Sequence, residues 1–375
     1  MQVIVIGGGI AGVAAAYHLA CRDQQVTLLE QESTLAFHST GRSAALFFEN
    51  YGAVANRPLT VASRSFFDHP PEGLIDHPVL SRRGVLWIGR PDQRSSLQAL
   101  MGESPGAGMA VWIEPEEAVA RVPLLRPELL AGAVLEPDAM DLDVAALHQG
   151  FVRGLRSGGG TIITRARVTA LSHGRGRWLL ETEAGDRQAD LIVNAAGAWC
   201  DQVGEMAGAH PIGLQPLRRT AFTVPGDAAW AEWPMIANIE NEFYFRPDGS
   251  QLLCSLAEEK PSEPCDAKPD PLDISLAIER INRDTTLDIR TVRASWTGLR
   301  SFVSDRAMAI GPDPALSGFF WLAGQGGTGI QTAPAAGELI AGLIIDGRPP
   351  AHLIDLGLDP QSLSPARLQA RSSPS

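Results

Sequence analysis

The sequence has few of the residues that build disulfide frameworks or metal centres. Its 375 residues include four cysteines, Cys21, Cys200, Cys254 and Cys265, which lie far apart with no CxxC pair and no clustered histidines near them. A disulfide framework and a zinc site are therefore not expected. We accordingly predict no metal ion in this protein.

Positive charge and long apolar runs are also scarce. The formal net charge of −12 at pH 7 argues against a nucleic-acid or anionic-membrane surface, because such surfaces need clustered Lys and Arg. No apolar run reaches about 18 residues, the length that a membrane-spanning helix needs. The N-terminus enters a strand pattern directly, without the pattern of a signal peptide. We expect a reduced, cytoplasmic protein with no membrane span.

The first thirty residues carry a dinucleotide-binding pattern. An apolar run at 3–6 is followed by Gly7-x-Gly9-x-x-Gly12, a helical pattern and a second apolar strand that ends at Glu30. In such a motif Gly7 makes a tight turn, Gly9 lets the backbone approach a pyrophosphate, and Gly12 lets the helix pack on the strand. Glu30 lies 18 residues beyond Gly12 (30 minus 12), which matches a carboxylate that binds the adenosine ribose. The pattern leaves both FAD and NAD open.

The rest of the chain predicts an α/β protein of two domains. We expect mostly helix at 93–157, short strands at 160–194 and 211–256, a helix at 271–283, a long strand at 289–303, and a C-terminal strand, Gly-rich turn and helix with Pro334 in its first turn. This order indicates a Rossmann-like cofactor domain built from discontinuous segments and a sheet-rich, α+β substrate domain. The predicted boundaries are 1–50, 145–210 and 300–362 for the cofactor domain, 51–144 and 211–299 for the substrate domain, and 363–375 for a flexible tail.

Five motifs together resemble the D-amino-acid oxidase superfamily of FAD-dependent amine and amino-acid oxidoreductases. They are VIVIGGGIAG, HSTGRSAA, VNAAGAW (193–199), TGLRSF (297–302) and GQGGTGIQTAPAAGE (324–338). The likeness runs over almost the whole chain, and is closest to the bacterial D-arginine dehydrogenase type of soluble D-amino-acid dehydrogenase. It implies FAD, held noncovalently because the C-terminal motif contains no cysteine.

The resemblance also implies where FAD binds. The segment from Ser39 to Leu46 would follow the flavin side of the pyrophosphate and the ring, with hydroxyls and amides on the phosphates. A helix starting near Gly329 would point its positive end at the flavin. The implied cofactor residues are Gly7, Gly9, Ala11, Gly12, Glu30, Gln31, Ser39, Thr40, Gly41, Arg42, Ser43, Ala44, Ala45, Leu46, Val168, Ala196, Gly197, Trp199, Arg300, Gly326, Gly327, Thr328, Gly329, Ile330 and Gln331.

A substrate site follows from the same resemblance. Arginine suits a substrate carboxylate, because its planar fork binds one bidentately. The residues implied to act there are Arg219 and Arg300 as the carboxylate clamp, Tyr51 and Tyr244 as side chains that close over the substrate, and Gly327 and Gln331 as a backbone contact and an amide near the substrate nitrogen.

Two departures from the family pattern concern the substrate side chain. Val85 stands where the closest relatives carry a glutamate for a cationic side chain, and Leu46 stands where they carry a histidine. A buried guanidinium without a carboxylate partner would be costly. We therefore expect a preference for apolar or aromatic D-amino acids over cationic ones.

The resemblance implies oxidative deamination: a hydride passes from the α-carbon to flavin N5, and the imino acid hydrolyses to a 2-keto acid and ammonia. Several oxidase relatives carry a lysine near the flavin, and the matching stretch GSQLLCSL has none. We therefore expect a dehydrogenase that uses a quinone or another acceptor, which leaves peripheral membrane contact open. Monomer and homodimer are both open.

Other functions remain open at this point. A 2-hydroxy-acid dehydrogenase would need a base, and His38, the only histidine in a flavin-site motif, is poorly placed for that role. A sarcosine- or glycine-type secondary amine oxidase fits the same fold. A flavin-binding protein without turnover would not need to retain two arginines and two tyrosines.

Overall fold

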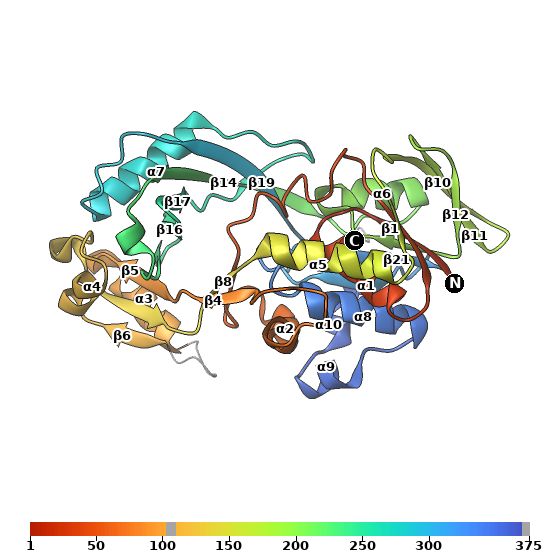
Figure 1. Ribbon diagram of the computed structural model, residues 1–375, viewed down its shortest axis with the longest axis horizontal. Helices are drawn as coiled ribbons and strands as arrows, with labels where there is room; N and C mark the ends of the chain where they lie inside the picture. Colours follow the sequence, from red (N-terminus) through yellow and green to blue (C-terminus); the bar gives the residue numbers. More distant parts are fainter. Residues whose placement is uncertain (103–109, 370–375) are drawn as a thin grey trace, which may run out of the picture.

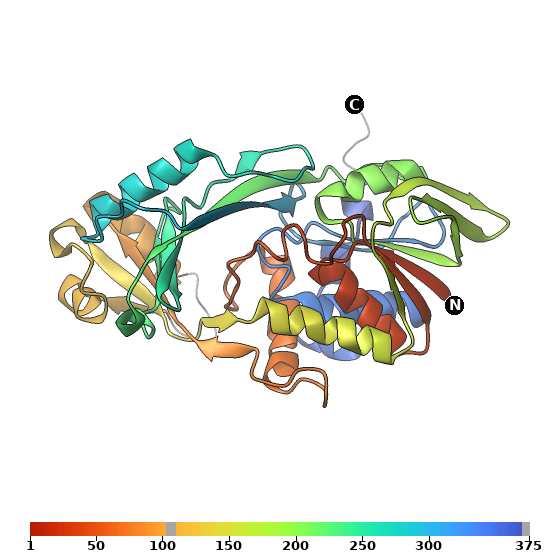
Figure 2. The same ribbon diagram turned by 45° about the horizontal axis from the view of Figure 1, so that its top comes forward.

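The computed structural model describes residues 1–102 and 110–369, and they form two lobes (Figure 1). The lobe at the right of the view holds both the N-terminal strand and the helices that follow residue 332 (Figure 1 and Figure 2). The lobe at the left holds most of a second sheet. Two long strands, β14 (Gln215–Pro225) and β19 (Ala294–Phe302), run from one lobe toward the other. The predicted α/β fold, with a Rossmann-like domain and a sheet-rich domain, is confirmed.

The right-hand lobe is built on a six-stranded sheet of order β20-β21-β13-β1-β2-β9. Its pairs are parallel except β20–β21, which is antiparallel. The strands are β1 (Gln2–Ile6), β2 (Gln25–Leu29), β9 (Thr161–Ile163), β13 (Leu191–Asn194), β20 (Ala309–Pro312) and β21 (Phe319–Ala323). They come from the start, the middle and the last part of the chain, so this lobe is assembled from discontinuous segments.

Alternation along β1 explains how both faces of this sheet are covered. Val3 and Val5 pack into a core with helices α1 (Ile10–Ala20), α5 (Val144–Ser157) and α8 (Ala333–Ile345). Ile4 and Ile6 face the opposite side and pack into a second core. The elements of that second core are β10 (Val168–Gly174), β11 (Arg177–Thr182), β12 (Arg187–Ala189) and α6 (Cys200–Ala207).

The left-hand lobe is built on a nine-stranded sheet of order β18-β14-β17-β16-β15-β5-β7-β6, with β19 also paired to β14. Its other strands are β5 (Val85–Gly89), β6 (Val111–Ile113), β7 (Gly132–Glu136), β15 (Met235–Asn238), β16 (Tyr244–Asp248), β17 (Gln251–Ser255) and β18 (Lys260–Pro261). One face buries alternate residues such as Phe222, Ile236 and Phe245 against α4 (Pro115–Arg121) and α7 (Pro271–Asp284). The opposite face is left for the site described below.

Short elements join and complete the two lobes. They are β3 (Leu46–Phe47), β4 (Leu80–Arg82) and β8 (Met140–Leu142) in one small sheet, helices α2 (Arg57–Asp68), α3 (Arg94–Gly102), α9 (Ala351–Asp355), α10 (Pro360–Leu363) and α11 (Ala366–Gln369), and 3₁₀ turns at Val54–Asn56, Pro91–Gln93, Pro127–Leu129, Gly197–Trp199 and Ala228–Trp230. Among the described residues, no helix is both long and apolar enough to cross a membrane.

Three expectations about the organisation are wrong in part. The stretch 93–157 also contains β6, β7 and β8, whose three to five residues are too short to show a clear alternation. Helix α2 falls in the predicted substrate segment 51–144, yet Leu59 and Phe67 are buried in the core that α8 shares. The predicted flexible tail is ordered over 363–369, where Leu363 and Leu368 are buried, and 370–375 lie outside the described residues. The other predicted boundaries stay a prediction.

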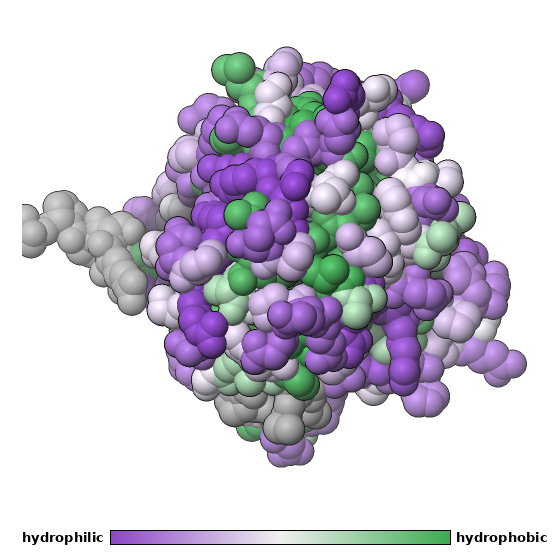
Figure 3. Space-filling model, turned by 90° about the vertical axis from the view of Figure 1, so that its left-hand side faces the viewer, coloured by the Kyte–Doolittle hydropathy of each residue, from purple (hydrophilic) through white to green (hydrophobic). Residues whose placement is uncertain are grey.

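The outer end of the left-hand lobe is mostly hydrophilic (Figure 3). Purple residues cover most of that face, and green ones lie in narrow areas between them. Exposed apolar side chains of this lobe include Leu272 on α7 and Val111 on β6. Scattered apolar residues of this kind are ordinary for a protein surface.

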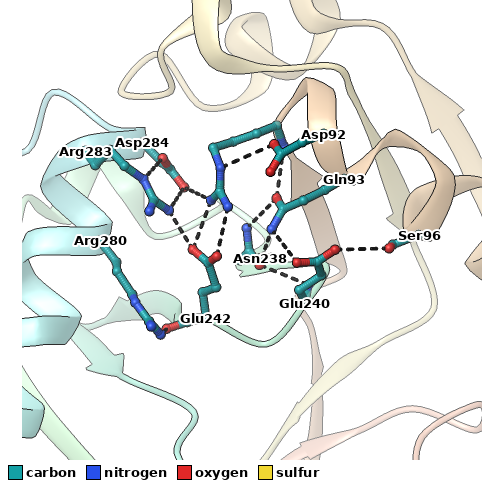
Figure 4. A network of polar contacts seen from close by, with 10 residues as sticks. Asp92, Gln93, Ser96, Asn238, Glu240, Glu242, Arg280, Arg283 and Asp284 are labelled. Atoms are coloured by element: carbon teal, nitrogen blue, oxygen red, sulfur yellow. Dashed lines mark hydrogen bonds and ion pairs between the residues drawn. The ribbon is translucent and has the colours of Figure 1, made fainter.

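A charged network joins α7 to the sheet in the left-hand lobe (Figure 4). Arg90 donates two hydrogen bonds to Glu242, at 2.9 and 2.8 Å, and Arg283 donates one to the same carboxylate at 2.6 Å. Arg283 also binds Asp284, whose side chain is buried. The hydrogen bonds from Arg90, and further contacts from Arg283, lower the pKa of Glu242 from its ordinary 4.5 to about 2.

Because the pKa of Glu242 is depressed in the folded state, its contribution to stability is present above about pH 4.5 and is lost as the pH falls toward 2. Glu242→Gln should therefore lower the midpoint of thermal unfolding by a few degrees at pH 7, with a corresponding drop in the urea midpoint. The difference in midpoint between the variant and the wild type should become smaller between pH 5 and pH 3. Glu279→Gln, at an exposed position of α7, is the matched control and should have little effect. A gap that is as large at pH 3 as at pH 7 would contradict this account.

Candidate active site

A continuous cavity lies between the Gly-rich turn after β1 and the open face of the second sheet. Its walls come from the N-terminus of α1, residues 36–48, the loop after β13, strands β14 to β16 with β5 and β19, and the turn at 325–331. One end is therefore built by the Rossmann-like lobe and the other by the sheet-rich lobe. The shape suits an extended dinucleotide with a small substrate at its far end.

The Gly-rich turn has no room for side chains. Gly7 has φ +112°, and a Cβ there would lie 2.3 Å from the Ala195 carbonyl oxygen. A Cβ on Gly12 would lie 1.8 Å from the Gly7 carbonyl oxygen, so α1 can approach β1 only because that residue is glycine. Gly12 itself packs behind the turn and does not line the cavity. Residues 9–11 line the cavity at the start of α1, and a helix N-terminus at that place fits a pyrophosphate.

Glu30 and a buried histidine hold this turn from both sides. Glu30 accepts hydrogen bonds from the N–H of Gly8 at 2.7 Å and of Glu32 at 2.8 Å. His148, on α5, lies 3.0 Å from the Gly8 carbonyl oxygen through Nε2. Burial lowers the pKa of His148, which keeps the ring neutral, so we assign the proton to Nε2 as donor. Sequence reasoning missed His148, since one histidine on a helical face carries no signal of its own.

The segment 37–46 is tied to β19 by its side chains. Ser39 Oγ donates to the Leu299 carbonyl at 2.6 Å, and Arg42 Nη1 donates to the Thr297 carbonyl at 3.0 Å. Arg42 also reaches Asp266 and the carbonyl of the next residue. Thr40 Oγ1 accepts from the N–H of Ile10 at 3.0 Å, in the first turn of α1. These side chains hold protein groups and also line the cavity, and phosphate binding by this segment stays a prediction.

The two predicted clamp arginines share one face of the sheet. In the antiparallel register of β14 and β19, Arg300 lies opposite Leu217 and Gly298 lies opposite Arg219. The arginines are therefore diagonal neighbours on the cavity side. Arg300 Nη1 donates to the Tyr51 hydroxyl at 3.0 Å, and Arg219 Nε donates to the Glu258 carbonyl at 2.8 Å.

The electrostatics of this pair favour an anionic ligand. Burial, and then repulsion from Arg300, lower the pKa of Arg219. Burial also works against the charge of Arg300, but attraction to Tyr51 and Tyr244 outweighs it and the pKa of that guanidinium is raised. Among the described residues, the ion pair of Arg219 is a 3.4 Å contact to the carboxylate of Glu259, which Arg306 also binds. Two close cations with one partial counter-ion leave room for a carboxylate between them.

Gly327 and Gln331 have different surroundings from one another. A Cβ on Gly327 would lie 2.6 Å from the Tyr51 hydroxyl, so a side chain there would displace Tyr51 from Arg300. Gln331 is buried, accepts from the N–H of Phe48 at 3.3 Å and donates to Thr60 Oγ1 at 3.1 Å. Its amide is thus already bonded to protein groups, although it also borders the cavity.

The turn before α8 also differs from the expectation. Helix α8 begins at Ala333, so the predicted helix start near Gly329 is wrong by one turn, and 326–332 form turns instead. Thr328 bonds to the Gln325 carbonyl through both its N–H and its hydroxyl, and it does not line the cavity.

An apolar wall closes the substrate end, and Val85 is not part of it. Val85 is completely buried beneath its neighbours, including Met235, so the predicted role in the substrate pocket is wrong. Trp87, two residues further along the same face of β5, lines the cavity instead. Leu46 lines the cavity as expected from the sequence, together with Phe48.

Most predicted residues border this single cavity, and four do not: Gly12, Gly41, Val85 and Thr328. Residues that sequence reasoning did not propose also line it, among them Phe37, His38, Phe48, Trp87, Ala166, Arg167, Gln202, Met206, Met235, Ala237, Asn241, Ser301 and Gln325. Alternation along β5 and β15 could have indicated Trp87, Met235 and Ala237. Within residues 1–102 and 110–369, no group of three or more His, Cys, Asp or Glu side chains could hold a metal ion.

Comparisons with known proteins agree with this architecture. The family model DAO, described as FAD dependent oxidoreductase, matches residues 2–343. Mitochondrial dimethylglycine dehydrogenase of Mus musculus is 26% identical over 381 residues, which cover 95% of this chain and 43% of that protein. The chain thus spans less than half the length of this relative.

Two solved structures have the same fold over nearly their whole length. L-proline dehydrogenase from P. horikoshii has a TM-score of 0.85 at 22% identity, covering 99% of this chain and 98% of its own. Glycine oxidase from Geobacillus kaustophilus has a TM-score of 0.83 at 22% identity, covering 97% and 98%. At these identities the likeness shows the fold.

Tyr51 should make anion binding pH-dependent. Arg300 stabilises the phenolate and holds the pKa of Tyr51 below its ordinary value of 10, despite burial. An ionised Tyr51 would pair with Arg300 and compete with a carboxylate ligand. The Kd of benzoate, which carries no amine, should therefore rise as the pH passes through this pKa, and Tyr51→Phe should lack that rise.

The measurement is calorimetric titration of benzoate between pH 7 and pH 10. Tyr17→Phe is the control, because Tyr17 lies in the core of the other lobe, and it should keep the alkaline rise. An unchanged rise in Tyr51→Phe would show that another group titrates.

Proposed function

The chain belongs to the DAO family of FAD-dependent oxidoreductases, with FAD as its cofactor, and from this premise we propose that it oxidises the carbon–nitrogen bond of a small amine that carries a carboxylate. The observation that carries the proposal is the pair Arg219 and Arg300 on one sheet face, in the cavity that also contains the Gly-rich turn. A buried pair of like charges is costly unless a ligand anion neutralises it.

An N-substituted amino acid is the substrate class that we favour. The relatives named above act, by their names, on dimethylglycine, L-proline and glycine, which all carry a carboxylate next to an amine. In two of these three the nitrogen carries further carbon substituents. The 26% identity over 95% of this chain supports the same chemistry here.

The cavity argues against a 2-hydroxy acid. Oxidation of a hydroxyl needs a base for its proton, whereas an amine that binds in its neutral form needs none. Among the described residues that line the cavity, Glu30 and His38 lie at the cofactor end, where they bond to the Gly-rich turn and to Glu32. The clamp end has arginines, tyrosines and apolar side chains.

The residues of the chain would divide the work as follows. Arg300 and Arg219 bind the carboxylate and fix the orientation of the substrate. Tyr51, hydrogen-bonded to Arg300, covers the carboxylate. The apolar wall excludes water, and this desolvation favours the neutral form of the substrate amine. FAD, when bound, supplies the oxidant that accepts the hydride from the carbon next to nitrogen.

D-Amino acids with apolar side chains are the second candidate. The resemblance of motifs such as TGLRSF favours them, and so does the apolar wall formed by Leu46, Phe48 and Trp87. For either substrate we propose an acceptor other than oxygen, such as a quinone. Neither of the two lysines, Lys260 and Lys268, lines the cavity.

Anaerobic mixing of the holoenzyme with a substrate panel tests the proposal. The panel contains N-methylglycine, L-proline, D-leucine, D-phenylalanine, D-arginine, the L-enantiomers and 2-hydroxy acids, and the readout is loss of the oxidised-flavin absorbance. Bleaching by N-substituted amino acids is expected. Bleaching by apolar D-amino acids alone would favour the second candidate, and bleaching by hydroxy acids alone would overturn both.

The clamp itself is tested by Arg300→Gln. Removing one partner of a buried charge pair costs about 2–5 kcal/mol, so kcat/KM should fall by roughly 10²–10³-fold, mainly through KM. Arg218→Gln is the matched control: Arg218 is the next residue on β14, points to the opposite face and donates to the Lys268 carbonyl. Equal losses in the two variants, measured by steady-state kinetics, would show that the arginine pair is not the carboxylate site.

A further inference from the structure

The open face of the second sheet carries two aromatic side chains with an alanine between them. Tyr244 lies directly opposite Ala237, and Ala237 lies directly opposite Trp87, on three neighbouring strands. Directly paired residues point to the same face, so the three side chains form one row. All three line the cavity. Because the middle residue is alanine, the smallest side chain of the row lies between the two aromatic ones, where it lines the cavity.

Trp87 is held in place from behind. Its indole N–H donates to Glu136 Oε2 at 2.7 Å. Its outer side packs against a small cluster that contains Leu97 and Val134. The N–H and one side of the ring are thus occupied, and the ring can offer only apolar surface to the cavity.

Glu136 connects this wall to the clamp end. It is 5% exposed, and its second oxygen accepts from Asn50 Nδ2 at 3.2 Å. Asn50 directly precedes Tyr51, whose hydroxyl accepts the hydrogen bond from Arg300. A second hydrogen bond, from Arg57 to the Asn50 carbonyl at 3.2 Å, holds the same segment. One buried carboxylate therefore fixes both the wall and the segment that carries Tyr51.

We propose that Trp87 determines which substrate substituent is accepted, by forming one side of a slot for a flat apolar group, and that Glu136 is the positioning residue that fixes Trp87. The inference rests on the proposed function: with the carboxylate on Arg300 and Arg219, the group carried by the nitrogen or by the α-carbon enters the slot. A planar ring or an unbranched chain fits between two aromatic faces.

The same geometry offers a cationic substituent no carboxylate partner. Both carboxylate oxygens of Glu136 accept hydrogen bonds from the protein, and Glu136 lies outside the lining of the cavity. A guanidinium or ammonium beside Trp87 would lose water and gain only contact with aromatic faces, which offsets part of that cost and favours an apolar group over it.

Binding of acetate and benzoate to the holoenzyme tests the slot without requiring turnover. The Kd of each carboxylate is measured from its perturbation of the flavin spectrum. The wild type should bind benzoate more tightly than acetate, and Trp87→Ala should reduce this ratio by roughly tenfold while the Kd of acetate changes little. Trp112→Ala is the matched control, because Trp112 packs against the same Leu97 cluster but does not line the cavity.

A double-mutant cycle tests the role of Glu136. Glu136→Gln should reduce the benzoate-to-acetate ratio in the wild-type background. Trp87→Phe keeps a flat ring but removes the N–H, so adding Glu136→Gln to Trp87→Phe should leave the ratio unchanged. Additive effects of the two substitutions would show that Glu136 does not act through Trp87. FAD content and unfolding midpoints of all variants identify any that are simply misfolded, and Glu136→Asp should restore part of the ratio.

Substrate pairs show which atom carries the group that enters the slot. The pair N-benzylglycine and N-methylglycine probes a group on nitrogen, and the pair D-phenylalanine and D-alanine probes a group on the α-carbon. The pair whose KM ratio changes in Trp87→Ala shows which of the two atoms carries the group beside Trp87. Equal changes in Trp87→Ala and Trp112→Ala would overturn the slot. A ratio of the benzoate and acetate Kd values that stays the same in every variant would also overturn the slot. A wild-type protein that neither binds carboxylates nor oxidises amines would instead overturn the proposed function.

Discussion

The hydrogen bonds between the segment 37–46 and strand β19 set the geometry on which the rest of the site depends. Ser39 donates to the Leu299 carbonyl and Arg42 to the Thr297 carbonyl, on either side of Gly298 and immediately before Arg300. Trp296 donates back to the Arg42 carbonyl at 2.9 Å. The Rossmann-like lobe is therefore hydrogen-bonded to the main chain of β19, the strand that carries Arg300. The separation between the Gly-rich turn and the substrate end follows from these bonds and not from a flexible linker.

Holding two guanidiniums on one sheet face is costly, and the structure offsets that cost only partly. The Tyr51 hydroxyl and the Glu258 carbonyl each accept one hydrogen bond from the pair. Burial also raises the pKa of the Glu258 carboxyl, which weakens a further anion close to Arg219. The site is thus left with unneutralised positive charge beside an apolar wall. That combination selects small anions with an apolar part, and it does so before any bond is broken.

The sequence allowed the local features to be predicted, and the long-range ones only by resemblance. The Gly7–Gly12 turn and Glu30 follow from spacing, because turn, helix and strand are neighbours along the chain. Arg219 and Arg300 follow from matched motifs, and their diagonal placement needed the register of β14 and β19. The sequence predicts Val85 in the substrate pocket and gives no indication of Trp87, because an alignment does not show which residue of a strand is covered by its neighbours. His148 and the contacts of Arg42 depend on segments distant in sequence.

The bonds between Ser39, Arg42 and β19 also bear on how such a protein can be recombined. The residues that grip the substrate sheet lie in the first fifty residues, inside the cofactor-binding half, while the carbonyls that they hold lie near residue 300. A chimaera that joins this Rossmann-like lobe to a foreign substrate sheet keeps these bonds only if the foreign strand places its main-chain carbonyls within reach of Ser39 and Arg42. The segment 37–46 and the strand therefore have to match, so the exchangeable unit does not coincide with the lobe seen in Figure 1.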